Sequence, residues 1–67
     1  MNLKDVYYIR AILRNRLSYY DEKRITKALI DAKNNGYDMG FIQNVCKEMN
    51  TWTEFKEFIR EYADVNL

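Results

Sequence analysis

The sequence predicts an all-α fold: a compact four-helix bundle with orthogonal packing, formed as a single domain by residues 1–67. Apolar residues recur at the three-to-four spacing of amphipathic helices in four successive stretches. The segments between these stretches are short and carry the residue types that begin and end helices. In addition, 48% of the residues are hydrophobic, and six Tyr, three Phe and one Trp supply aromatic bulk. Such a composition suits a small domain, which buries only about 60% of its unfolded surface.

The first helix is expected at residues 3–17, where Asn2 is suited to cap its start. Asp5 lies in the first turn, and Arg14 and Arg16 lie in the last turn. These positions match the charges that the helix dipole favours at each end. The apolar stripe that should face the core consists of Val6, Ile9, Leu13 and Leu17.

The second helix is expected at residues 19–34, and its start has two alternative caps. Ser18 followed by Asp21 resembles a capping box that would begin the helix directly after Ser18. Asp21 could equally be the cap itself, which would move the start by one turn. The buried stripe of this helix should consist of Ile25, Ala28, Leu29 and Ala32.

The third helix is expected at residues 39–49 and follows a glycine turn. Gly36 should end the second helix, because glycine adopts the positive φ of helix termini at little cost. Asp38 should cap the new helix. The third helix is short, so we expect orthogonal packing. Its inward-facing residues should be Met39, Ile42, Val45, Cys46 and Met49.

The fourth helix is expected at residues 52–63, where Thr51 and Glu54 form a capping box. The residues after Ala63 are expected to fray. This helix has the most aromatic stripe of the chain, formed by Trp52, Phe55, Phe58, Ile59 and Tyr62.

Composition argues against an enzyme. The chain has no histidine, the usual general base near neutral pH. Its one cysteine, Cys46, lies on the buried stripe and is expected to be structural, because a nucleophilic thiol needs an accessible, electropositive site. Glu54, Glu57 and Glu61 share a helix flank, which we interpret as a solvated face. We therefore predict no catalytic residue, no cofactor and no metal ligand.

Charge and hydropathy bear on location and partners. No stretch approaches the roughly 20 apolar residues of a membrane span, and charges interrupt any leader-like run near the start. We therefore expect a cytoplasmic protein with no membrane partner. Abundant Lys, Asn, Ile and Tyr fit an AT-rich genome, such as that of a bacterium, phage or plasmid. Residues 1–34 carry eight basic and four acidic side chains, whereas residues 35–67 carry three and six, so a homodimer could pair opposite flanks.

One spacing resembles the helix-turn-helix family of DNA-binding proteins. The pattern is a small residue, a glycine four positions later, and apolar residues six and nine beyond, here Ala32, Gly36, Ile42 and Val45. The resemblance implies that the helix at 39–49 is a recognition helix, with Gln43 and Asn44 reading bases and Lys47 meeting a phosphate. Two departures are Asn35, where the family usually has an apolar residue, and an excess of acids over bases between residues 36 and 49.

The same turn is similar to that of ubiquitin-associated-type three-helix modules. Those modules carry a Gly-aromatic pair between their first two helices, which here is Gly36-Tyr37. The resemblance implies a protein-binding surface that includes Tyr37, Phe41 and parts of the fourth helix. Apolar residues that match the module on either side of the pair are Leu29, Ile42, Cys46 and Phe55.

The first helix offers a further candidate surface. Tyr7, Arg10 and Arg14 share a flank, and Tyr and Arg are enriched at interface hot spots. The alternative is that the tyrosines cover the core and the arginines pair with the glutamates of the fourth helix. We therefore expect a small non-enzymatic regulatory or inhibitory protein that docks a helical face on a protein partner. The alternative is a helix-turn-helix DNA-binding regulator.

Overall fold

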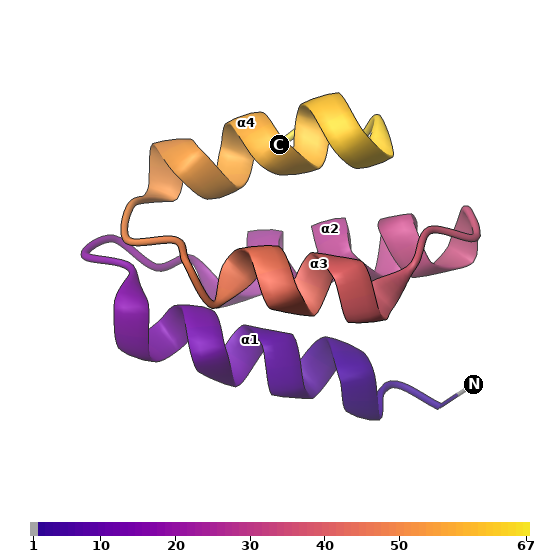
Figure 1. Ribbon diagram of the computed structural model, residues 1–67, viewed down its shortest axis with the longest axis horizontal. Helices are drawn as coiled ribbons and strands as arrows, with labels where there is room; N and C mark the ends of the chain where they lie inside the picture. The colour runs from indigo at the N-terminus through magenta and orange to yellow at the C-terminus, as the bar shows by residue number, and fades with distance from the viewer. Residues whose placement is uncertain (1) are drawn as a thin grey trace.

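All four stretches are helical in the computed structural model, which describes residues 2–67. The elements are α1 (Lys4–Arg16), α2 (Glu22–Asn34), α3 (Met39–Cys46) and α4 (Trp52–Ala63), with no strand in the described part of the chain. Figure 1 shows successive helices running in opposite directions, with α3 between α1 and α4 and with α2 behind. The predicted all-α class is confirmed, whereas the orthogonal packing stays a prediction.

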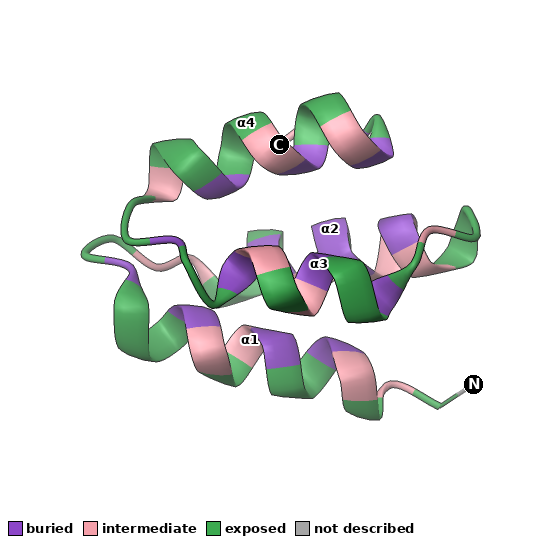
Figure 2. Cartoon of the chain, in the orientation of Figure 1, coloured by how far each residue is buried: buried purple, intermediate pink, exposed green. Residues whose placement is uncertain are grey.

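The core lies where the apolar stripes of the helices meet. α1 packs against α2 and α3, and α2 also contacts α4. Figure 2 shows buried residues along these inner faces and exposed residues along the outside of α4. Each stripe residue named above for α1 and α2 is buried. The side chains buried completely or nearly so include Val6, Ile9, Leu13, Ile25, Leu29, Ile42, Cys46, Phe55 and Ile59.

α2 begins later than a Ser18 cap would place it, so the expected start at residue 19 is wrong. Asp21 is the cap, and its carboxylate accepts a hydrogen bond from the Arg24 N–H at 3.2 Å. Leu17 is buried in an extended conformation and ends α1, so the chain crosses to α2 before helix can resume. A carboxylate also interacts more favourably than a hydroxyl with the positive end of the helix dipole.

The turn between α2 and α3 is a Schellman motif with Gly36 at its left-handed position. Gly36 has φ of +86°. The Tyr37 N–H donates to the Ala32 carbonyl at 3.2 Å, and the Gly36 N–H donates to the Lys33 carbonyl at 3.0 Å. Asp38 then caps α3 by accepting from the Gly40 and Phe41 N–H groups at 2.9 and 3.2 Å. The predicted helix stop and cap are both confirmed.

The sequence predicted that the third helix would end at residue 49, but α3 ends at Cys46. The Glu48 and Met49 N–H groups donate to the Val45 and Cys46 carbonyls, three residues back. Such bonds are of the 3₁₀ type and replace the α-helical pattern at this point. Arg16 of α1 donates from Nε to the Met49 carbonyl at 2.7 Å. This contact ties the connection to α1, and Met49 is buried directly after the end of the helix.

α4 begins with the predicted capping box, in which Thr51 and Glu54 each bond to the other's backbone N–H. The expectation that the tail frays is wrong. Asp64 turns the chain with φ of 55°, and the N–H groups of Asp64 and Val65 both donate to the Ile59 carbonyl. Val65 is only 6% exposed. The tail therefore folds back and adds one apolar side chain to the core.

Candidate functional site

The five predicted protein-binding residues lie in two separate groups. Tyr7, Arg10 and Arg14 lie on α1, whereas Tyr37 lies in the turn before α3 and Phe41 lies in the first turn of α3. The contacts of Tyr37 and Phe41 are with aromatic side chains of α4. The structure therefore joins the second group to a further helix, and we consider that surface first.

Four aromatic side chains form a surface cluster, here called the aromatic ledge: Tyr37, Phe41, Phe58 and Tyr62. The Phe41 ring centroid lies 4.9 Å from that of Tyr62 and 6.2 Å from that of Phe58. Phe58 and Tyr62 stack at 5.4 Å with an interplanar angle of 6°, and Tyr37 lies 5.4 Å from Tyr62. Phe41 nevertheless remains 46% exposed. The ledge presents apolar rings that the rest of the protein covers on one side only.

Two local features position the ledge. The positive φ of Gly36 reverses the chain, so Tyr37 follows the end of α2 directly and meets α4. The Asp38 cap fixes the first turn of α3, including the backbone of Phe41. On α4, Phe58 and Tyr62 are four residues apart and so share a helix face. Three of the four ledge residues thus lie on two capped helices, and Tyr37 lies in the hydrogen-bonded turn that precedes α3.

A groove of about 360 Å³ adjoins the ledge between the end of α3 and α4. Phe58 belongs to both features, and Val45 and Met49 supply further apolar lining. Every remaining lining side chain is acidic, so we call the feature the acidic groove. The four acidic residues are Glu48, Glu54, Glu57 and Glu61.

The four glutamates differ in their bonding. Glu54 accepts from the Asn50 and Thr51 N–H groups at 3.0 and 2.9 Å, and these hydrogen bonds lower the pKa of its carboxyl. It therefore stays ionised while it caps α4. Glu48, Glu57 and Glu61 are exposed and form no ion pair within residues 2–67. Their charges face solvent around an apolar floor.

The α1 surface is organised differently. The Arg10 guanidinium lies 3.6 Å from the Glu22 carboxylate, donates to the Thr26 hydroxyl at 3.0 Å, and sits 4.8 Å from the centroid of Tyr7. The expected pairing of these arginines with glutamates of α4 is therefore wrong. Arg10 instead ties α1 to α2, because both helices run side by side there. Arg14 is exposed.

The candidate DNA-reading residues lie around the second half of α3. Gln43 is half-buried, Asn44 is exposed, and Lys47 lies in the turn that follows the helix. Glu48 comes next and belongs to the acidic groove. A phosphate backbone laid along Asn44 and Lys47 would therefore approach the adjacent Glu48 carboxylate, which opposes its binding.

Cys46 is completely buried, and this burial raises the pKa of its thiol to about 12. The thiolate is the nucleophilic form of cysteine, so this thiol is unreactive at neutral pH. Burial against the core matches the expectation of a structural cysteine.

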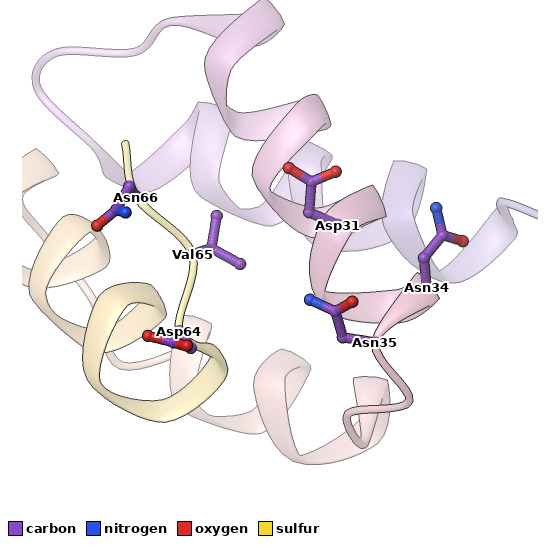
Figure 3. A pocket seen from close by; sticks show the side chains of 6 residues that line it. All are labelled: Asp31, Asn34, Asn35, Asp64, Val65 and Asn66. Carbon is purple, nitrogen blue, oxygen red and sulfur yellow. The ribbon is translucent and has the colours of Figure 1, made fainter.

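A second, smaller crevice of about 210 Å³ lies between the end of α2 and the C-terminal tail. Figure 3 shows the residues that line it: Asp31, Asn34 and Asn35 at the end of α2, and Asp64, Val65 and Asn66 of the tail. Asp31 already bonds to Lys27 at 2.9 Å. The volume lies below the 300–1,000 Å³ range of ordinary ligand pockets. We regard this crevice as the seam left by the folded-back tail.

Comparisons with known proteins identify no relative of this chain. No protein-family model matches the chain, and neither a curated protein nor a solved structure shows detectable similarity to it. The two resemblances described above therefore rest on residue spacing alone. Among the described residues, no helix has the length and apolar character that crossing a bilayer requires.

Sequence reasoning found part of this surface. It nominated Tyr37 and Phe41 and noted the glutamates of α4, but it interpreted those glutamates as a plain solvated face. Glu48 and the apolar floor were missed, because their position depends on where α3 ends. No local signal marks that end, because the Arg16 side chain that bonds the α3–α4 connection lies far away in the sequence, at the end of α1.

Proposed function

We propose that this chain is a small non-enzymatic regulatory or inhibitory protein that acts by docking the face formed by α3 and α4 on a protein partner. The aromatic ledge and the acidic groove together form the docking surface. Binding there would block or bias the partner's own surface, so no chemical step is required of this chain.

One observation carries the proposal: Phe41 is nearly half exposed although two aromatic rings, those of Phe58 and Tyr62, lie beside it. Aromatic side chains with a rigid support are typical interface anchors, because they bury a large area at little entropic cost. A purely structural ring would sit more favourably inside the core. The adjacent charges supply the polar rim that protein interfaces have around such anchors.

The test compares two exposed aromatic residues of similar exposure. Phe41→Ala removes the most exposed ring of the ledge, and Tyr8→Ala removes a ring of α1 that is 53% exposed and outside the ledge. Tagged wild type and both variants are used to capture partners from host cells, after circular dichroism has shown equal helicity. We expect a partner that wild type and Tyr8→Ala retain and that Phe41→Ala loses.

A third variant addresses the α1 face. If Arg10→Glu with Arg14→Glu abolishes capture while Phe41→Ala retains it, the docking face is on α1. Retention of every partner by Phe41→Ala rejects the proposed surface.

DNA binding is the alternative function, supported by the spacing around Gly36 and by exposed Asn44 and Lys47. A DNA reader should bind random duplex with an affinity that falls steeply with salt, and Asn44→Ala with Lys47→Ala should weaken it. Absence of duplex binding at low salt removes this alternative. The acidic groove beside α3 makes a protein partner the better-supported function.

A further inference from the structure

We infer that the acidic groove binds a basic amphipathic helix of the partner protein, with an apolar stripe on its floor and Lys or Arg side chains against its rim. This inference rests on the proposed function and specifies the chemistry of the partner. Three features of the groove carry it: its apolar floor, the periodic spacing of its carboxylates, and the lack of any basic residue among those that line it.

The apolar floor of the groove requires an apolar side chain on the ligand. Val45 and Phe58 are half-buried and Met49 is buried, and all three line the groove. The volume of about 360 Å³ admits a large apolar side chain. A wholly polar segment would leave this floor without a partner, whereas an apolar side chain would bury it.

The rim sets the charge and the geometry of the ligand. Glu54, Glu57 and Glu61 repeat at intervals of three and four residues, so they form one row of about 10 Å along α4. A helix lying beside α4 would present cations with the same repeat. Glu48 adds a fourth carboxylate from the end of α3, on the other side of the groove. Helix-in-groove recognition uses this combination of apolar stripe and flanking charge.

A second copy of this chain fits the groove less well. Its basic surface would have to come mainly from α1 and α2, where Arg10, Lys27 and Lys33 are already paired with carboxylates of the same chain. Such a contact joins two different faces, so it closes into a dimer only where a twofold axis lets the basic face of each copy meet the groove of the other. A basic helix of another protein meets neither obstacle.

The probe is an amidated, fluorescein-labelled peptide of about 18 residues, long enough to populate a helix. Its Leu residues recur at the three-to-four spacing, with Lys and Arg on one flank. A scrambled peptide of the same composition and a peptide with Glu in place of Lys and Arg are compared with it. Binding is measured by fluorescence polarisation in low and in physiological salt. We expect wild type to bind the patterned basic peptide more tightly than either comparison peptide.

Two double variants locate the binding. Glu57→Gln with Glu61→Gln removes two rim charges and leaves the Glu54 capping box intact. Glu22→Gln with Asp31→Asn gives the same change in net charge on α2, away from the groove. The rim variant should weaken binding by about two- to thirtyfold, the sum expected for two exposed ion pairs, relative to the α2 variant.

The outcomes separate the two proposals. Equal binding of the scrambled peptide, or equal affinity of the two double variants, overturns the groove as a helix site. Concentration-dependent self-association that Glu57→Gln with Glu61→Gln abolishes would make a second copy the occupant and also overturn it. If the groove fails while Phe41 is still needed for partner capture, the proposed function stands through the ledge alone. If the groove binds the patterned peptide while Phe41→Ala captures the same partners as wild type, the ledge is rejected as part of the docking surface.

Discussion

Replacing Gly36 with alanine should destabilise the protein through backbone conformation alone. A Cβ built at Gly36 meets no heavy atom within 4 Å, so the substitution causes no steric clash with the rest of the fold. The residue has φ of +86°, however, and an L-residue in the left-handed region costs about 1–2 kcal/mol. Alanine also lowers the conformational entropy of the unfolded chain, which offsets part of this cost. We therefore expect the free energy of unfolding to fall by about 1 kcal/mol, equivalent to about 4–8 °C in Tm for a domain of this size.

Urea unfolding followed by circular dichroism and by the fluorescence of Trp52, the single tryptophan, measures this loss. Gly36→Asn is the matched variant, because asparagine tolerates positive φ better than alanine does and should lose less stability. Equal stability of wild type and Gly36→Ala would show that the turn does not need positive φ in solution. A loss well above 2 kcal/mol would show a steric conflict, contrary to the open space around this position.

Three further predictions concern the tail, a buried hydroxyl and the effect of pH. Val65→Ala should lower the free energy of unfolding by about 1.5 kcal/mol, because it removes buried apolar atoms. Asn66→Ala, at an exposed position of the same tail, should change it by less than about 0.5 kcal/mol. Equal urea midpoints for the two variants would mean that the tail is frayed. The hydroxyl of Tyr20 is buried without a hydrogen-bond partner in residues 2–67, so Tyr20→Phe should leave thermal stability unchanged or raise it by up to about 1 kcal/mol; a clear loss would reveal a bonded hydroxyl. The hydrogen bond from Lys33 holds the pKa of Asp5 below its ordinary value of 3.8. Asp5 therefore stabilises the fold above that value and loses its contribution as pH falls through its folded-state pKa, so acid unfolding of Lys33→Met should depend less steeply on pH than that of wild type.

The sequence was most informative where a signal is local. Amphipathic spacing identified all four helices, and the caps at Asp38 and Thr51 act within one helical turn of themselves. The left-handed turn at Gly36 was readable for the same reason. The choice between Ser18 and Asp21 could not be made, since it depends on the burial of Leu17 against other helices. The folding back of Val65 was equally hidden, because two apolar residues in a four-residue tail are too few to establish a periodicity.

The same distinction between local and distant causes applies to the two parts of the candidate site. Tyr37 and Phe41 flank the Gly36 turn and its cap, so their place on the surface follows from a few neighbouring residues. The acidic groove depends instead on Arg16, which lies 33 residues before the Met49 carbonyl to which it donates. That bond accompanies the early end of α3 and leaves Met49 and Glu48 beside the α4 glutamates. A row of glutamates on one helix is ordinary solvated surface; under the proposed function, the apolar floor beside it would let this surface select a partner by both shape and charge.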